Sequence, residues 1–130
     1  MIKRERDGKV YYLFPGGTVD IGESGMDAAC REVKEEVGLD VIIGPPIAEI
    51  EFNGNHQSYF VAEIAGGDFG TGTGLEILGK APVENGTYTP TWMPISGLGR
   101  LDVRPRAVVD LLISSRTNGW PAEILRLKEK

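Results

Sequence analysis

The chain has one cysteine, no long apolar run and fewer basic than acidic residues. Cys30 therefore has no partner for an intramolecular disulfide. No segment is apolar enough to span a bilayer, and the first four residues show no signal-peptide pattern, so we expect a cytoplasmic protein with no membrane partner. The net charge of −5 argues against binding a nucleic acid polymer, which needs a basic surface. A small phosphorylated substrate is not excluded.

The length and composition predict one domain, residues 1–130. A chain of 130 residues is long enough for a single core and too short for two. Its 41% apolar and 25% charged residues are typical of a globular protein. We expect no interdomain linker.

Acidic residues are concentrated between Gly17 and Leu39. On a helix, Glu35 and Glu36 lie one turn beyond Glu32, so the three carboxylates share a sector of about 100°. Like charges at this spacing destabilise a helix by roughly 0.2–0.5 kcal/mol per pair. A divalent cation such as Mg²⁺ binds oxygen ligands and removes this repulsion. The cluster predicts a metal site, with a solvated acidic helix face as the alternative reading.

Capping signals predict that the helix carrying these carboxylates spans about residues 24–37. Ser24 is a favourable N-cap, and Gly38 suits the left-handed position after a helix. Opposite the carboxylates, the sequence predicts an apolar face that packs in the core, with Cys30 as a small core residue. This face consists of Met26, Ala29, Cys30, Val33 and Val37.

The remaining patterns predict a mixed α and β fold. We expect a hairpin from residues 1–6 and 9–14, a closing helix over 104–115 with Val108, Leu111 and Leu112 inside, and a flexible connection over 66–74. Trp92 is expected to pack in the core and His56 to be a polar turn residue. Further strands are predicted near residues 40–43, 47–52, 57–64 and 87–94.

The acidic segment also matches a known signature. Gly17, Glu23, Arg31-Glu32-Val33, Glu35-Glu36 and Gly38-Leu39 coincide with every defined position of the Nudix box, and Phe14-Pro15-Gly16 precedes it as in the family. The chain therefore resembles the Nudix (MutT-like) hydrolases over most of its length. The resemblance implies an α/β (α+β) fold, the Nudix α/β/α sandwich, with a mixed β-sheet flanked by the Nudix-box helix and a C-terminal helix.

The resemblance implies Mg²⁺-dependent hydrolysis of a diphosphate bond in a nucleoside diphosphate linked to another moiety, with Mn²⁺ as a substitute ion. A (deoxy)nucleoside triphosphate or an oxidised nucleotide is the candidate substrate. The alternatives are a Nudix-like nucleotide-binding or regulatory module without turnover, and a structural Ca²⁺ site.

By the same resemblance, metal ligands are expected from the Gly16 carbonyl and from Glu32, Glu35 and Glu36. A Glu23–Arg31 ion pair is expected to orient this turn. Glu35 or Glu76 would act as the general base, since Glu76 follows a glycine-rich segment that could close over a substrate. Glu84 is the second choice for this distal carboxylate.

The amino-terminal region carries two further expectations. Nudix domains generally have another strand before the first hairpin, and little chain precedes Gly17 here. Either that edge is covered by a second copy in a homodimer, or the true start lies upstream. The basic residues Lys3, Arg4, Arg6 and Lys9 suit a solvated edge strand, with phosphate contact as the alternative.

Overall fold

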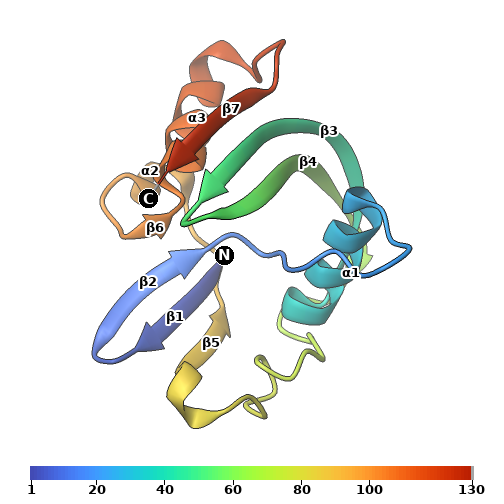
Figure 1. Ribbon diagram of the computed structural model, residues 1–130, viewed down its shortest axis with the longest axis vertical. Helices are drawn as coiled ribbons and strands as arrows, with labels where there is room; N and C mark the ends of the chain where they lie inside the picture. The colour runs from blue at the N-terminus through green and yellow to red at the C-terminus, as the bar shows by residue number, and fades with distance from the viewer. Residues whose placement is uncertain (130) are drawn as a thin grey trace.

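The computed structural model describes residues 1–129 (Figure 1). The first half contains β1 (Ile2–Arg6), β2 (Lys9–Leu13), α1 (Gly25–Val37), β3 (Leu39–Phe52) and β4 (Asn55–Gly67). The second half contains the 3₁₀ turn η1 (Val83–Asn85), β5 (Thr87–Pro90), α2 (Ile95–Leu98), β6 (Val103–Arg104), α3 (Arg106–Asn118) and β7 (Leu125–Glu129).

The strands form two mixed sheets, with the orders β5-β1-β2-β6 and β4-β3-β7. In the first sheet β1 is antiparallel to both β2 and β5, while β6 is parallel to β2. In the second sheet β3 is antiparallel to β4 and parallel to β7. The predicted α+β class and mixed strand directions are confirmed. Because β5 covers β1, the edge that suggested a homodimer is paired within the chain.

Two hairpins shape these sheets. The predicted β1–β2 hairpin is present, and its turn residues Asp7 and Gly8 have φ values of 52° and 74°, as a tight hairpin turn requires. The strands expected at residues 40–43 and 47–52 are one continuous strand, β3. Its register with β4 shifts on either side of Pro46, because prolines 45 and 46 have no N–H for the ladder and a bulge accommodates them.

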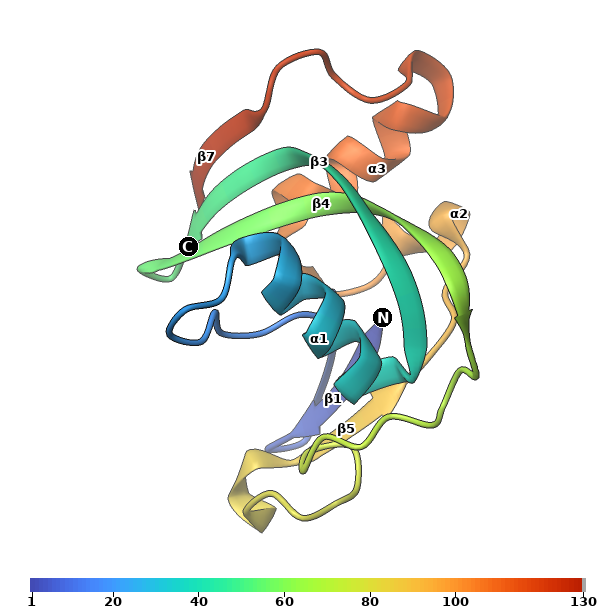
Figure 2. The ribbon, with the colours of Figure 1, turned by 90° about the vertical axis from the view of Figure 1, so that its right-hand side faces the viewer.

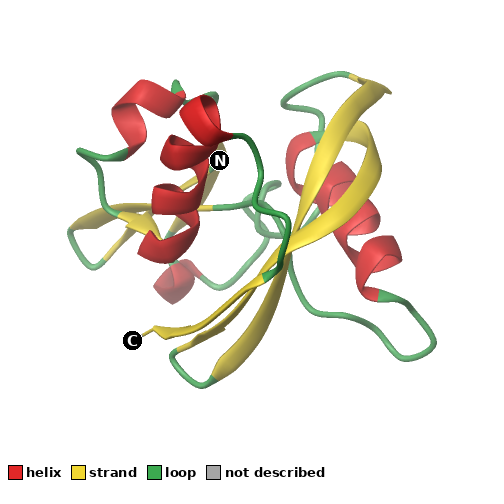
Figure 3. Cartoon of the chain, turned by 90° about the horizontal axis from the view of Figure 1, so that it is seen from above, coloured by secondary structure: helices red, strands yellow, loops and turns green. Residues whose placement is uncertain are grey.

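Helices α1 and α3 lie on opposite sides of the β3–β4 hairpin (Figure 3). On one side, Ala48 and Ile50 of β3 pack against Val108 of α3. On the other, Val37 at the end of α1 packs with Leu39 and Ile2. Both helices therefore have a fixed position on the curved β3 strand. Within residues 1–129, no helix is long and apolar enough to cross a membrane.

The ends of α1 agree with prediction, but its packing face does not. The Ser24 hydroxyl accepts the Asp27 N–H at 3.1 Å, and Gly38 has a φ of 83°. Cys30 is exposed, which corrects its assignment to the core, and Met26 is 45% exposed. Ala28 is buried instead. Ala28 lies on the same side of α1 as Glu32 and Glu35, at positions i, i+4 and i+7. The start of the acidic side of the helix is therefore buried by other parts of the protein.

The second half departs further from prediction. The strand expected over residues 87–94 ends at Pro90, and the closing helix begins at Arg106, where Pro105 occupies the N-cap. Neither β6 nor β7 was predicted. Trp92, expected in the core, is 63% exposed and stacks on Phe69 with ring centroids 4.7 Å apart.

Candidate active site

Arg31 lies at the centre of the acidic cluster on α1. Its Nε and Nη2 donate to the two Glu23 carboxylate oxygens at 2.8 and 2.9 Å. Its Nη1 donates to Glu32 at 2.9 Å and to Glu35 at 3.2 Å. The second N–H of Nη2 donates to the Thr18 carbonyl at 3.0 Å. One guanidinium therefore joins the loop before α1 to two carboxylates of the helix, and the expected Glu23–Arg31 pair is present.

Glu23 is held rigidly at the start of this network. Its side chain is only 16% exposed, and its Oε1 also accepts the Asp20 N–H at 3.0 Å. The bidentate bond from Arg31, helped by the Asp20 amide, lowers the pKa of Glu23 to about 2. Asp20 approaches Arg31 to 3.4 Å, a contact that the sequence analysis missed. Glu23 therefore stays ionised and orients Arg31.

Glu36 faces the glycines that precede the helix. Its Oε2 accepts the Gly16 N–H at 2.9 Å. Burial raises the pKa of Glu36 to about 7, the Gly16 bond opposes this rise, and the charges of Glu32, Glu76 and Glu35 add to it. A half-buried carboxylate among three others is costly to ionise without a counter-ion.

Glu32 fits against Gly17. A Cβ placed on Gly17 would lie 2.5 Å from the Glu32 carboxyl carbon, so only glycine leaves room for the carboxylate in this position. Burial raises the pKa of Glu32, Arg31 opposes this, and Glu35 and Glu76 again contribute to the rise. The glycine at the start of the signature thus fixes where this carboxylate lies.

The segment between β4 and β5 passes beneath the carboxyl-terminal end of α1 (Figure 2). The Gly70 and Gly74 amides donate to the Val37 and Glu35 carbonyls, each at 2.9 Å. The segment then folds into a compact turn carrying Glu76, whose charge acts on Glu32 and Glu36. The glycine-rich stretch predicted as a plain connection is therefore docked on the helix.

The two candidates for the distal carboxylate are clearly separated. Glu76 lies close to α1, because a Cβ placed on Gly74 would be 3.5 Å from the Glu76 Oε2 and 3.3 Å from the Glu35 carbonyl oxygen. Glu84 is in η1 and lines a hollow of about 370 Å³ with the β1–β2 turn instead. A second cavity of about 370 Å³ lies between the ends of β3 and β7 and the start of α3. None of the α1 carboxylates lines either one.

Other polar residues named from the sequence lie outside the cluster. Lys3 pairs with Glu5, and Arg6 with Asp7. The Arg4 guanidinium is buried against the Tyr88 ring. The expected solvated edge strand is therefore wrong, because β1 pairs with both β2 and β5 and Arg4 is buried, although these contacts give the basic residues structural partners. His56 pairs in register with Glu51 near the tip of the β3–β4 hairpin.

The donor chemistry of the cluster fits a hard divalent cation. Four carboxylates gather here, and the pKa values of two of them are raised partly by their neighbours. An oxygen-binding cation would relieve that repulsion. Within residues 1–129, no three acidic, histidine or cysteine side chains already converge as a metal-holding group. Arg31 and the Gly16 amide hold the carboxylates in their present orientations, so binding requires side-chain rotation.

The fold and the acidic turn held by Arg31 define a protein of the Nudix class. The family model of the NUDIX domain matches residues 1–107, and the chain belongs to this family. Nudix hydrolases generally use divalent metal ions. The family match supports the predicted pyrophosphohydrolase class.

Three solved structures share the fold. A NUDIX hydrolase from Nitrosomonas europaea is 22% identical with a TM-score of 0.60, covering 99% of this chain and 71% of its own. An ADP-ribose pyrophosphatase from Streptococcus suis 89-1591 is 17% identical with a TM-score of 0.60, covering 99% and 88%. The ORF135 protein of E. coli is 17% identical with a TM-score of 0.56, covering 94% and 84%. The comparison with curated proteins found no match.

Proposed function

We propose that residues 1–130 form one catalytic domain that hydrolyses a diphosphate bond with Mg²⁺ as its cofactor. The observation that carries the proposal is that Glu32, Glu35 and Glu36 lie on one turn of α1, where the charges of neighbouring carboxylates contribute to the raised pKa values of Glu32 and Glu36. Such mutual repulsion has no structural benefit in a protein without a cation. Mn²⁺, which accepts the same oxygen ligands, is expected to substitute.

Glu32, Glu35, Glu36 and the Gly16 carbonyl would hold the metal. When bound, the ion would neutralise charge on the phosphoryl oxygens and lower the pKa of a water molecule. Arg31 keeps Glu32 and Glu35 on the same side of the helix. The loss of such a supporting contact typically costs about 10- to 100-fold in metal affinity or activity.

Glu76 is the proposed general base. Within residues 1–129 it makes no ion pair, whereas Glu35 accepts a hydrogen bond from Arg31. Its carboxylate oxygens are therefore free to accept a proton from the attacking water. Glu35 is the alternative base, and comparison of the two Glu→Gln variants distinguishes them.

The proposed substrate is a nucleoside diphosphate linked to another moiety. The ADP-ribose pyrophosphatase among the structural neighbours makes ADP-ribose one member of the panel to test. A (deoxy)nucleoside triphosphate and an oxidised nucleotide are the other members. All of them present the diphosphate that the acidic cluster, once loaded with metal, would bind.

The test is a nucleotide panel with Mg²⁺ or Mn²⁺ and separate detection of monophosphate and pyrophosphate. Glu35→Gln, Glu36→Gln and Glu76→Gln should each lower kcat by about 10²-fold or more, and the larger loss between the Glu35 and Glu76 variants identifies the general base. Glu63→Gln, an exposed carboxylate on β4, is the matched control and should keep full activity. Tight nucleotide binding with no product would instead indicate the binding module. Stabilisation by Ca²⁺ with indifference to nucleotides would indicate a structural ion site.

A further inference from the structure

We propose that Lys80 binds the diphosphate of the substrate directly. The inference rests on the proposed function and adds a residue that neither the Nudix signature nor the acidic cluster contains. It follows from the charges available around α1, from the fold of the turn that carries Lys80, and from the direction of its side chain.

Within residues 1–129, the other cations around the acidic cluster already have partners, including the Met1 ammonium, which donates to the Thr91 carbonyl at 3.1 Å. Every N–H group of Arg31 is already engaged, by Glu23, Glu32, Glu35 and the Thr18 carbonyl. Lys34, on the same helix, pairs with the Asp40 carboxylate at 3.3 Å.

The amino-terminal cations are also occupied or distant. Arg4 is buried, and its guanidinium donates to the carbonyls of Thr87 and Asn85. Lys3 and Arg6 pair with acidic neighbours on or beside their own strand. Within residues 1–129, Lys80 is exposed and makes no ion pair.

The turn that positions Glu76 also positions Lys80. The amides of residues 77 and 78 donate to the Gly74 carbonyl at 3.1 and 3.0 Å. The Gly79 amide donates to the Glu76 carbonyl at 3.3 Å. The Lys80 amide donates to the Leu75 carbonyl at 2.8 Å and closes the turn. Gly74 in turn donates to the Glu35 carbonyl of α1. Lys80 is therefore attached to the helix of the acidic cluster through a short series of backbone hydrogen bonds.

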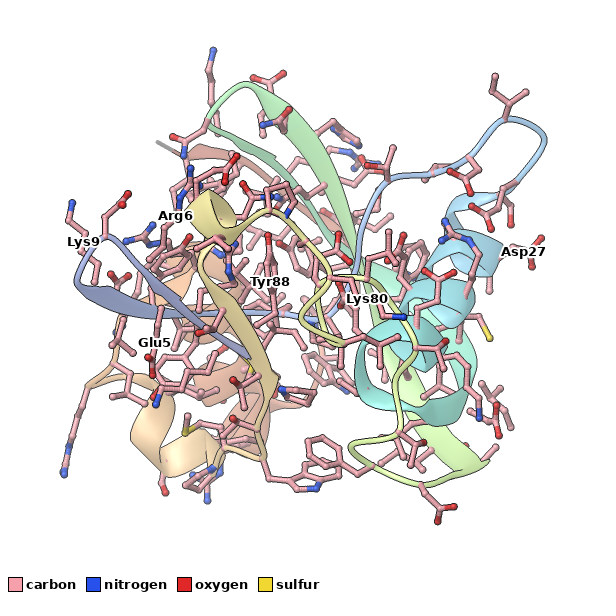
Figure 4. All side chains as sticks on the ribbon, turned by 90° about the horizontal axis from the view of Figure 1, so that it is seen from below. Glu5, Arg6, Lys9, Asp27, Lys80 and Tyr88 are labelled. Carbon is pink, nitrogen blue, oxygen red and sulfur yellow. The ribbon has the colours of Figure 1, made fainter. Side chains whose placement is uncertain are left out.

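The Lys80 side chain extends from this turn toward α1, as seen from below (Figure 4). Lys9, in contrast, lies at the tip of the β1–β2 hairpin at the other side of the molecule (Figure 4). An ammonium group brought to this side of α1 would partly offset the repulsion between the carboxylates and a phosphorylated substrate. The Glu76 turn would thus bring a proton acceptor and a phosphate-binding cation to the site together.

The direct test measures binding without turnover. Methylenediphosphonate, a diphosphate that cannot be hydrolysed at its bridge, is titrated by calorimetry in Mg²⁺ into the wild type, Lys80→Ala, Lys80→Arg and the matched control Lys9→Ala. Lys80→Ala should weaken binding about 10- to 100-fold, the effect of one charge-assisted hydrogen bond. Lys80→Arg should recover most of the affinity, and Lys9→Ala should stay within about twofold of wild type.

Kinetics provide the second measurement, with a substrate that the wild type hydrolyses. In Lys80→Ala the KM should rise by about 10-fold or more while kcat changes less, because the ammonium binds ground state and transition state alike. Equal diphosphonate affinities for Lys80→Ala and Lys9→Ala would overturn the inference, as would an unchanged KM. A wild type that binds diphosphonate through Lys80 but releases no product from any nucleotide would refute the proposed hydrolysis alone.

Discussion

The raised pKa of Glu36 predicts that replacing this proposed metal ligand stabilises the metal-free protein at alkaline pH. Glu36 has a pKa of about 7 in the folded chain, against 4.5 for the ordinary group. Below pH 4.5 both states are protonated, so the full stability is present. Between pH 4.5 and 7 the unfolded chain releases a proton that the folded chain retains, so stability falls as the pH rises.

The size of this loss follows from the shift. A rise from 4.5 to about 7 corresponds to about 3 kcal/mol at pH 8, where the folded state must carry the buried charge. Glu36→Gln has a similar shape and keeps an oxygen that can accept the Gly16 N–H. The variant should therefore be more stable than wild type by up to about 3 kcal/mol at pH 8, and by less than about 1 kcal/mol at pH 5.

The assay is urea unfolding in EDTA at pH 5 and pH 8, with Glu63→Gln as the exposed control. Addition of Mg²⁺ at about 1,000 times its Kd should reverse the order at pH 8, because it stabilises the wild type by about 4.1 kcal/mol and has fewer ligands in the variant. A Glu36→Gln protein no more stable than Glu63→Gln at pH 8 in EDTA would refute the reasoning.

Two further predictions concern packing beside the site and the cap of α3. Gly17→Ala should displace the flexible Glu32 carboxylate, whose carbon lies 2.5 Å from the added Cβ, so kcat/KM should fall by about 10-fold or more while the urea midpoint barely moves; Gly25→Ala, which meets only an ordinary contact, is the control. Glu129→Ala should lower the free energy of unfolding by about 0.5–2 kcal/mol with unchanged kcat, since the carboxylate accepts the first two amides of α3 at 2.7 and 2.9 Å. Loss of activity in the Glu129 variant, or a collapse of stability in the Gly17 variant, would contradict these assignments.

The sequence predicted best those features that depend on neighbours along the chain. The limits of α1 follow from Ser24 and Gly38, and the first hairpin follows from Asp7-Gly8, because caps and tight turns are local. The Glu23–Arg31 pair was predicted through the family resemblance, and the structure contains it.

Features that depend on distant segments were not predicted. In β7, Leu125 and Leu127 alternate with Arg126 and Lys128, a pattern too short to identify a strand, and the strand forms because β3 offers it a parallel partner. The core face of α1 was misjudged at Cys30 and Ala28, because helical periodicity cannot reveal which side another segment covers. The docking of the Gly70–Gly74 segment depends on backbone amides, which carry no sequence signal beyond the glycines themselves.

That docking has a consequence for motion. A helix leaves its last carbonyls without internal partners, and here Gly74 and Gly70 supply amides to Glu35 and Val37. Any opening of the segment that carries Glu76 and Lys80 must break these bonds and expose the end of α1 to water. Hydrogen exchange at the two glycine amides should therefore report the same event as fraying of the last helical turn. Release of the Glu76 segment and local unfolding of the helix that carries the acidic cluster would then be a single equilibrium.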